Sequence, residues 1–274
     1  MMASDRPSAS SASISNCPEP CWANAPAADV AAAAPRGEPM QQEETVSLST
    51  GPRVRRNRAR GPWRSRARQA TKGAPGASRR RYPPGVITDA VPRPAGRRRQ
   101  YEASDAQHTL ALPPARPLQR QAERLRAAME GAKAVEVRRA GQELLDGLAA
   151  FYGVRPPRLR VLGVRPHAVR EGHLTYELFG DYTFAGGVIR AWMRTAILGK
   201  VTTYRGMLST VLHELAHHLD VKLFDWPDTP HTRGFYGRVD ELYHRALGTP
   251  ADKRKPLVWI RTGTRWRIDW TKLR

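Results

Sequence analysis

Cysteine, acidic side chains and long apolar runs are all scarce in this chain of 274 residues. The two cysteines, Cys17 and Cys21, lie in a Pro/Ala-rich stretch, which excludes a disulfide framework and a zinc ribbon of four cysteines. No run of about 18 apolar residues could span a membrane, and the N-terminus has no apolar signal-peptide core. We therefore expect no membrane contact and a cytoplasmic location, with association with the nucleoid left open.

The shortage of acidic residues leaves an unevenly distributed positive charge. Lys and Arg number 46 against 25 Asp and Glu, which gives a net charge of +21. Residues 1–50 carry −4, residues 51–100 carry +15 and residues 251–274 carry +6, so that the segment 101–250 is only +4. The basic character thus belongs to the flanks, and such flanks favour contact with nucleic acid.

Residues 1–105 are predicted to form a disordered tail rich in Arg, Pro and Ala. Large aliphatic side chains are too few there to offset the conformational entropy of a fixed chain. Arginine clusters such as Arg53–Arg68 are interleaved with Trp63, Tyr82 and Tyr101, a composition typical of segments that bind phosphates and stack on bases. A GC-rich coding sequence, or a start codon assigned too early, explains the same composition, and both explanations stay open.

The segment Val211–Asp220 reads VLHELAHHLD and contains the pattern H-E-x-x-H. Residues four apart lie on the same face of a helix, so His213 and His217 can bind one metal ion. Zinc is the expected metal, because imidazole suits it and a tetrahedral site keeps one position open. Glu214 lies at the edge of that face, where it can take a proton from the attacking water. The chemistry that this pattern predicts is peptide-bond hydrolysis.

An apolar stripe predicts a helix at this motif. Its members are Leu208, Val211, Leu212, Leu215, Ala216 and Leu219. Their spacing of three and four residues is that of a helix lying on a core. The two histidines and Glu214 fall outside the stripe, so we expect them to face a cleft. His218 points about 100° away from His217 on such a helix and is predicted to be a hydrogen-bonded flank rather than a ligand.

A catalytic zinc needs a third protein ligand, and His231 is the preferred candidate. It follows His217 by fourteen residues, enough for a loop to fold the next helix back onto the first. The alternatives are the acidic residues Asp220, Asp225, Asp228, Asp240 and Glu241. Asp220 is preferred as an acceptor that orients a histidine N–H. The group that polarises the substrate carbonyl stays open among Tyr204, Arg233 and Tyr236.

The segment before the H-E-x-x-H motif contains apolar residues at the spacing of helices and then at that of strands. Apolar residues recur three and four apart over Leu118–Met129 and Val137–Phe151, which predicts two helices, with folded structure beginning near Leu118. Between residues 159 and 195, alternating apolar residues predict three or four short strands in a meander. The last of them, Val188–Thr195, is the candidate edge strand that would hold a substrate, and an ordinary half-exposed strand is the alternative.

The remaining elements complete an α+β fold. A helix Pro230–Leu247 is predicted, with Thr229 as its N-cap, and Val258–Trp270 suggests a basic β-hairpin in the extension 251–274. Residues 106–250 are therefore expected to form a small domain, in which helices pack on a short meander and the metal site lies between two helices.

The pattern HELAHHLD, a loop and then HTRGFY resembles the SprT-like zinc metallopeptidases. That family pairs H-E-x-x-H with a third histidine that opens the following helix and an aromatic residue four positions on, here His231 and Phe235. The resemblance covers about Val137–Leu247 and includes a Gly-x-Tyr turn at Gly180–Tyr182. It implies a small zincin fold in which zinc binds the three histidines and Glu214 is the catalytic acid and base.

Some members of that family are DNA-dependent proteases that degrade proteins crosslinked to DNA, a role that the arginine-rich flanks would suit. Many members carry a C-terminal zinc ribbon, which this chain lacks. The leading hypothesis is an intracellular zinc endopeptidase that acts on protein or peptide substrates and is recruited to DNA by its tails. The alternatives are a nucleic-acid-binding protein with a non-catalytic zincin-like domain and a metal-dependent hydrolase of a non-peptide amide. The oligomeric state stays open.

Overall fold

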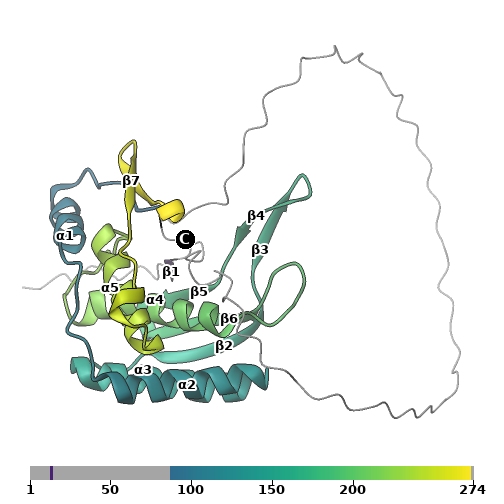
Figure 1. Cartoon of the computed structure of the whole chain (residues 1–274). Coiled ribbons are helices and arrows are strands. Elements are labelled where there is room, and N and C mark those ends of the chain that lie inside the picture. Colours follow the sequence, from purple (N-terminus) through teal and green to yellow (C-terminus); the bar gives the residue numbers. More distant parts are fainter. Residues whose placement is uncertain (1–12, 15–86, 273–274) are drawn as a thin grey trace, which may run out of the picture. The chain divides into compact units, whose positions relative to one another are not determined.

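Five α-helices and three small sheets make up residues 13–14 and 87–272, the part of the chain that the computed structural model describes (Figure 1). The helices are α1 (Ala95–Ala106), α2 (Ala115–Glu130), α3 (Ala134–Tyr152), α4 (Tyr204–Lys222) and α5 (Arg233–Leu247). The strands are β1 (Ser13–Ile14), β2 (Arg158–Val164), β3 (His167–Arg170), β4 (His173–Glu177), β5 (Gly180–Thr183), β6 (Val188–Arg194), β7 (Trp259–Thr262) and β8 (Arg265–Ile268). The fold is α+β, as predicted. All of these residues belong to one of the two units into which the chain divides, and the other unit, 27–81, lies outside the described residues.

The larger sheet has the strand order β1-β5-β6-β2. β2 and β6 are parallel, whereas β5 pairs with β6 in the antiparallel sense, with Gly180 opposite Ala191. A parallel pair needs a long crossover, and β3, β4 and β5 supply it, so the predicted simple meander is wrong. The predicted edge strand is wrong as well, because β6 has partners on both sides. Beyond β6 on that side lies β5, and β1 pairs with β5 in the antiparallel sense, with Ile14 opposite Tyr182.

Helix α4 packs on this sheet and against α5, and it is buried along most of its length. Every residue of the predicted apolar stripe is at most 2% exposed, which confirms that face as core. Five leucines of α2 and α3 complete this core, namely Leu118, Leu125, Leu144, Leu145 and Leu148. The histidine side of α4 is also buried.

Helix α1 lies inside the segment predicted as a disordered tail, and this part of the prediction is wrong. Tyr101 and Ser104 are buried, and the hydroxyls of Ser104 and Thr232 lie 3.0 Å apart. The contact between α1 and α5 is mostly polar, so hydrophobic periodicity did not reveal it. The burial of Tyr101 also removes it from the aromatic residues expected to stack on bases. The arginine cluster Arg53–Arg68 lies outside the described residues.

Helix α5 begins three residues later than predicted. Its N-cap is Thr232, whose hydroxyl accepts a hydrogen bond from the Phe235 N–H at 3.0 Å. Thr229, the predicted cap, has a φ of 32°. Its hydroxyl binds a ring nitrogen of His217. The helix start predicted from Thr229 and Pro230 is therefore wrong, because the Thr229 hydroxyl contacts the His217 imidazole instead of capping the helix. His231 consequently lies in the loop before α5.

The predicted C-terminal hairpin is confirmed as β7 and β8, with a turn at Gly263, whose φ is 59°. The chain before α1 joins it: Ile87 bridges Arg267, and the Thr88 N–H donates to the Trp266 carbonyl at 2.8 Å. The Trp266 N–H donates in return to the Thr88 hydroxyl at 2.9 Å. The two ends of the range 87–272 therefore pair with each other beside α5.

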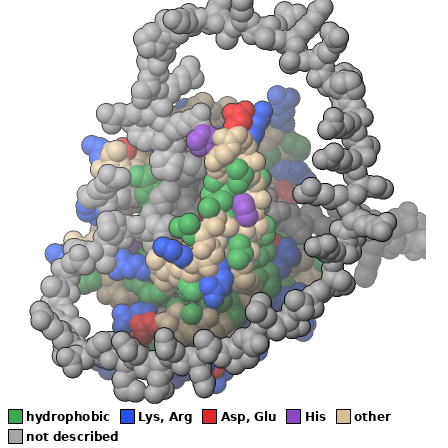
Figure 2. All heavy atoms as spheres, turned by 90° about the vertical axis from the view of Figure 1, so that its right-hand side faces the viewer, with side chains coloured by type: hydrophobic (Ala, Val, Ile, Leu, Met, Phe, Trp, Pro, Cys, Tyr) green, Lys and Arg blue, Asp and Glu red, His purple; other side chains and the backbone are tan. Residues whose placement is uncertain are grey.

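The second hairpin, β3 with β4, stands apart from the main sheet. Figure 2 views the molecule from this side and shows hydrophobic and histidine side chains at its surface. Val169 and Leu174 are 51% and 44% exposed there. Within the described residues, no helix combines the length and the apolarity that a membrane span requires.

The close approach of α1 to α5 depends on a glycine and can be tested there. A Cβ added to Gly234 would overlap the Ser104 carbonyl oxygen and lie 2.7 Å from that of Gln107. We expect Gly234→Ala to lower the free energy of unfolding by about 1–3 kcal/mol, measured by urea denaturation. Gly96→Ala, on α1 itself, is the control, because its Cβ meets no described atom within 4 Å. Equal stability of the two variants would contradict this packing.

Candidate metal centre

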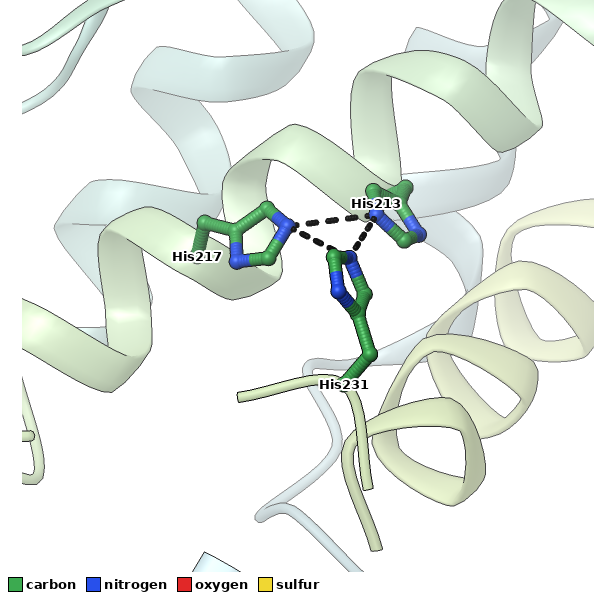
Figure 3. A group of neighbouring side chains, drawn as sticks. All are labelled: His213, His217 and His231. Carbon is green, nitrogen blue, oxygen red and sulfur yellow. Dashed lines mark hydrogen bonds between the residues drawn. The ribbon is translucent and has the colours of Figure 1, made fainter. Parts of the chain in front are cut away.

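Three imidazoles meet where α4 faces the loop before α5 (Figure 3). His213 and His217 lie one turn apart on α4, and His231 approaches them from the loop. The Nε2 atoms of the α4 pair are 3.2 Å apart, and each lies 3.1 Å from the Nε2 atom of His231. The three residues are 3%, 2% and 6% exposed. The structure thus brings together the three histidines that were predicted as ligands.

The geometry of this cluster fits a metal ion. Two facing imidazoles can share one proton, but three mutually facing ring nitrogens cannot all be paired as donor and acceptor. In a tetrahedral site with metal–nitrogen bonds of about 2.0–2.1 Å, neighbouring nitrogens lie roughly 3.3 Å apart, close to the separations found here. Burial, followed by the proximity of His231 and His213, holds the pKa of His217 well below its ordinary value. Its imidazole is therefore neutral and offers a lone pair.

The acidic alternatives for the third ligand do not reach the cluster. Among the described residues, the group able to hold a metal contains the three histidines and no carboxylate. Asp228 and Asp240 pair instead with Arg97 and Arg254. Of the other three, Glu241 accepts from the Leu110 N–H at 3.2 Å, Asp225 is exposed, and Asp220 pairs with Arg238.

Asp220 was expected to orient a histidine, and that expectation is wrong. Its Oδ1 atom accepts a hydrogen bond from Arg238 at 2.7 Å, and the two side chains are 0% and 1% exposed. Burial raises the pKa of Asp220 to about 6, although Arg238 opposes the shift. Arg238 also donates to the carbonyl oxygens of Ser104 and Gln107 at the end of α1. The pair therefore joins α4, α5 and α1 next to the cluster.

Two of the histidines have polar partners on their second ring nitrogen. The Nδ1 atom of His217 binds the Thr229 hydroxyl, and that of His231 lies 3.5 Å from a carboxylate oxygen of Asp89. The Nδ1 atom of His213 is buried without a hydrogen-bond partner among the described residues. Sequence reasoning missed both partners, because Thr229 was taken as a helix cap and Asp89 fell in the predicted tail. No local sequence signal distinguishes either residue.

Glu214 is placed by the close packing of α4 against strand β5. It is 3% exposed. A Cβ on Gly180 would lie 2.9 Å from its Oε1 atom and 2.5 Å from the Cγ2 atom of Thr210. The absence of a side chain at Gly180 therefore leaves the room that the Glu214 carboxylate occupies next to strand β5.

His218 holds the far side of α4 and is no part of the cluster. Its Nδ1 atom lies 2.9 Å from the Tyr182 hydroxyl, and its Nε2 atom lies 2.8 Å from the Arg155 carbonyl oxygen. Because the carbonyl can only accept, Nε2 carries the proton and Nδ1 accepts from Tyr182. Burial lowers the pKa of His218. The predicted role as a hydrogen-bonded flank agrees with these contacts.

The three candidates for polarising a substrate carbonyl lie in different places. The ring of Tyr236 lies 5.8 Å from that of His231 and 6.1 Å from that of His213. Arg233 forms an ion pair with Asp105. Tyr204 packs on the hydrophobic core, where burial raises its pKa to about 12. Of the three, Tyr236 is the one beside the cluster.

Comparison of the chain with protein-family models, with curated proteins and with solved structures gives no match. The functional reading of the site therefore depends on its residues and their geometry.

The buried ion pair beside the cluster leads to a prediction about stability. Replacing Asp220 by Ala leaves Arg238 buried without its counter-charge, and we expect a loss of about 3–5 kcal/mol in the free energy of unfolding. The control is Asp252→Ala, which removes an ion pair whose side chains are 72% and 74% exposed, with an expected change within about 0.5 kcal/mol. Chemical denaturation measures both. A loss below about 1 kcal/mol for Asp220→Ala would show that the pair does not hold the helices together.

Proposed function

We propose that the chain is a zinc-dependent metallopeptidase of the SprT-like kind, built on a small zincin-like domain. The observation that carries the proposal is the meeting of three buried imidazoles on and opposite the helix that bears Glu214. A catalytic zinc has three protein ligands, whereas a structural zinc is closed by a fourth. Among the described residues no fourth ligand joins the group. The H-E-x-x-H pattern supports the same proposal, because a structural site has no use for Glu214.

Each residue of the site takes a role from its chemistry. His213, His217 and His231 would hold the ion through the Nε2 atoms that face one another. When bound, zinc lowers the pKa of a water molecule and polarises a carbonyl group. A carboxylate oxygen of Glu214 accepts a proton from the attacking water and passes it to the leaving amine nitrogen. Among the described residues, Tyr236 has its ring beside those of His213 and His231, and it is the preferred donor to the carbonyl oxygen of the substrate.

The substrate-binding edge in this proposal is β5 instead of β6. An extended peptide can add to the outer strand of a sheet through main-chain hydrogen bonds. Strand β5 carries Gly180 against Glu214, which places this strand beside the site. The two-residue strand β1 pairs there, with Ser13 opposite Thr183. An extended backbone therefore fits this edge, and protein or peptide substrates are the class that it would take.

We propose that the protein binds DNA, and that this binding brings it to its protein substrates. Arg97, Arg98 and Arg99 are exposed on α1, and Arg261 and Arg265 are exposed on the hairpin of β7 and β8. Both elements contact the segment 87–89, which reaches the His231 loop. Exposed arginines favour phosphate contacts and a binding affinity that falls with salt. This basic surface supports DNA binding whether or not the site is catalytic.

The proposed function is tested by cleavage of an unfolded protein substrate. Wild type and Glu214→Gln would be compared, with zinc bound, in the presence and absence of single-stranded DNA. We expect the variant to keep zinc, because its three histidines are unchanged, and to lose at least a hundredfold in the rate of cleavage, because the proton acceptor is gone. Product formation is followed by gel electrophoresis and mass spectrometry.

Each outcome of that comparison separates one reading from another. Cleavage by wild type alone supports the peptidase, and a requirement for DNA supports recruitment by the basic surface. Equal cleavage by both proteins would contradict the role of Glu214. If both proteins hold zinc and bind DNA but neither cuts, the proposal gives way to a nucleic-acid-binding protein with a non-catalytic domain.

The position of Glu214 against β5 gives a second prediction. Gly180→Ala would force the carboxylate away from its place, since the added Cβ lies within 2.9 Å of Oε1. We expect zinc affinity close to that of wild type and a rate of cleavage lower by about ten- to a hundredfold, as a displacement of about 1 Å produces. Gly163→Ala, at an exposed position of β2, is the control for a glycine substitution, because its Cβ meets no described atom within 4 Å and its φ is not positive. Unchanged cleavage by Gly180→Ala would show that Glu214 keeps its position without this glycine.

A further inference from the structure

The backbone of His231 lies in a loop and is less constrained than that of His213 and His217, which lie in a helix. His213 and His217 are fixed by helix α4, whereas His231 precedes the first residue of α5 and follows Thr229, whose φ of 32° is unusual for a residue with a side chain. A loop residue has more freedom than a helical one, so its imidazole needs another constraint to point at the cluster. The structure provides such a constraint from a distant part of the chain.

We propose that Asp89 is a positioning residue that fixes the backbone and the imidazole of His231 for metal binding. The Asp89 N–H donates to the His231 carbonyl oxygen at 2.8 Å, and the His231 N–H donates to the Oδ2 atom of Asp89 at 2.9 Å. The same Oδ2 atom lies 3.5 Å from the Nδ1 atom of the ring. These contacts span 142 residues of sequence. The proposal rests on the metal site of the proposed function, but not on its peptidase activity.

The position of the carboxylate also determines which ring nitrogen of His231 carries no proton. A carboxylate next to Nδ1 favours the tautomer with its proton on Nδ1, and the Nε2 lone pair then faces the other two histidines. Partners of this kind orient metal-binding histidines, and their removal weakens metal affinity by about 10–100-fold. Asp89 would thus act on the metal through His231, without being a ligand.

Asp89 is itself held from two sides. Before it in sequence, Thr88 exchanges two hydrogen bonds with Trp266 of β8 and is 1% exposed. The carbonyl oxygen of Asp89 accepts a hydrogen bond from the Tyr101 hydroxyl of α1 at 3.1 Å. The C-terminal hairpin and α1 therefore fix the residue that fixes His231. A side chain that is 54% exposed, as that of Asp89 is, would otherwise move freely.

The experiment measures zinc affinity by competition with a chelator for the full chain and its variants. We expect Asp89→Ala to weaken zinc binding by about 10–100-fold. Asp89→Asn keeps an oxygen that can accept from the His231 N–H, so its loss should be smaller. The visible spectrum of the cobalt-substituted protein gives a second readout, because a displaced imidazole changes the ligand field. Circular dichroism confirms that each variant is folded.

The matched control is Asp105→Ala. Asp105 also anchors the start of α5, because it accepts from the Arg233 N–H at 2.9 Å, and among the described residues its carboxylate pairs with Arg233 and with none of the three histidines. A variant that merely loosens this region should leave zinc affinity within about twofold of wild type. If Asp105→Ala weakens zinc as much as Asp89→Ala does, the effect of Asp89 is general and the proposal fails.

A second background decides whether Asp89 acts through His231. In a His231→Ala chain, which is expected to bind zinc much more weakly, adding Asp89→Ala should change the affinity no further. An equal loss in both backgrounds, or an unchanged affinity of Asp89→Ala alone, would overturn the proposal. Tight zinc binding without peptide cleavage would leave it standing while the proposed function fails. An absence of zinc binding by wild type would overturn both.

Discussion

One buried guanidinium, that of Arg238, unites the elements that build the candidate metal centre. It binds Asp220 on α4, one turn beyond His217, and the carbonyl oxygens of Ser104 and Gln107 at the end of α1. A buried charge is strongly destabilising unless it is paired and hydrogen-bonded. The three helices must therefore adopt the arrangement that satisfies it. The same arrangement sets the start of α5, and with it the loop of His231, against the histidines of α4.

Features with a local period were predictable from the sequence. The apolar stripe of α4 is buried as expected, and helices cover the predicted segments Leu118–Met129 and Val137–Phe151. His213 and His217 share a helix face, so their spacing alone brings their rings together. His231 was placed by loop length and by resemblance to a family. The structure puts it in the cluster, but in the loop before α5 instead of on the helix.

The features that the sequence did not reveal depend on contacts between distant segments. Helix α1 is rich in arginine and packs through polar contacts against Gly234, so it lacks the apolar signal of a folded helix. Asp89 and Thr229 support imidazoles through single hydrogen-bonding atoms, for which no spacing rule exists. The parallel pairing of β2 with β6 depends on a crossover, whereas alternation reports only that each strand has two faces.

The pairing of Thr88 with Trp266 has a consequence for the order in which the site is assembled during synthesis. Helix α4 can fold soon after residues 204–222 leave the ribosome, which puts two imidazoles in register early. The support for His231 requires β8, and Trp266 emerges well after all three histidines. In a nascent chain, the support that we propose for His231 is therefore missing until the C-terminal hairpin is free to pair. For a hydrolase, such a delay would keep the site inactive while the chain is still being made.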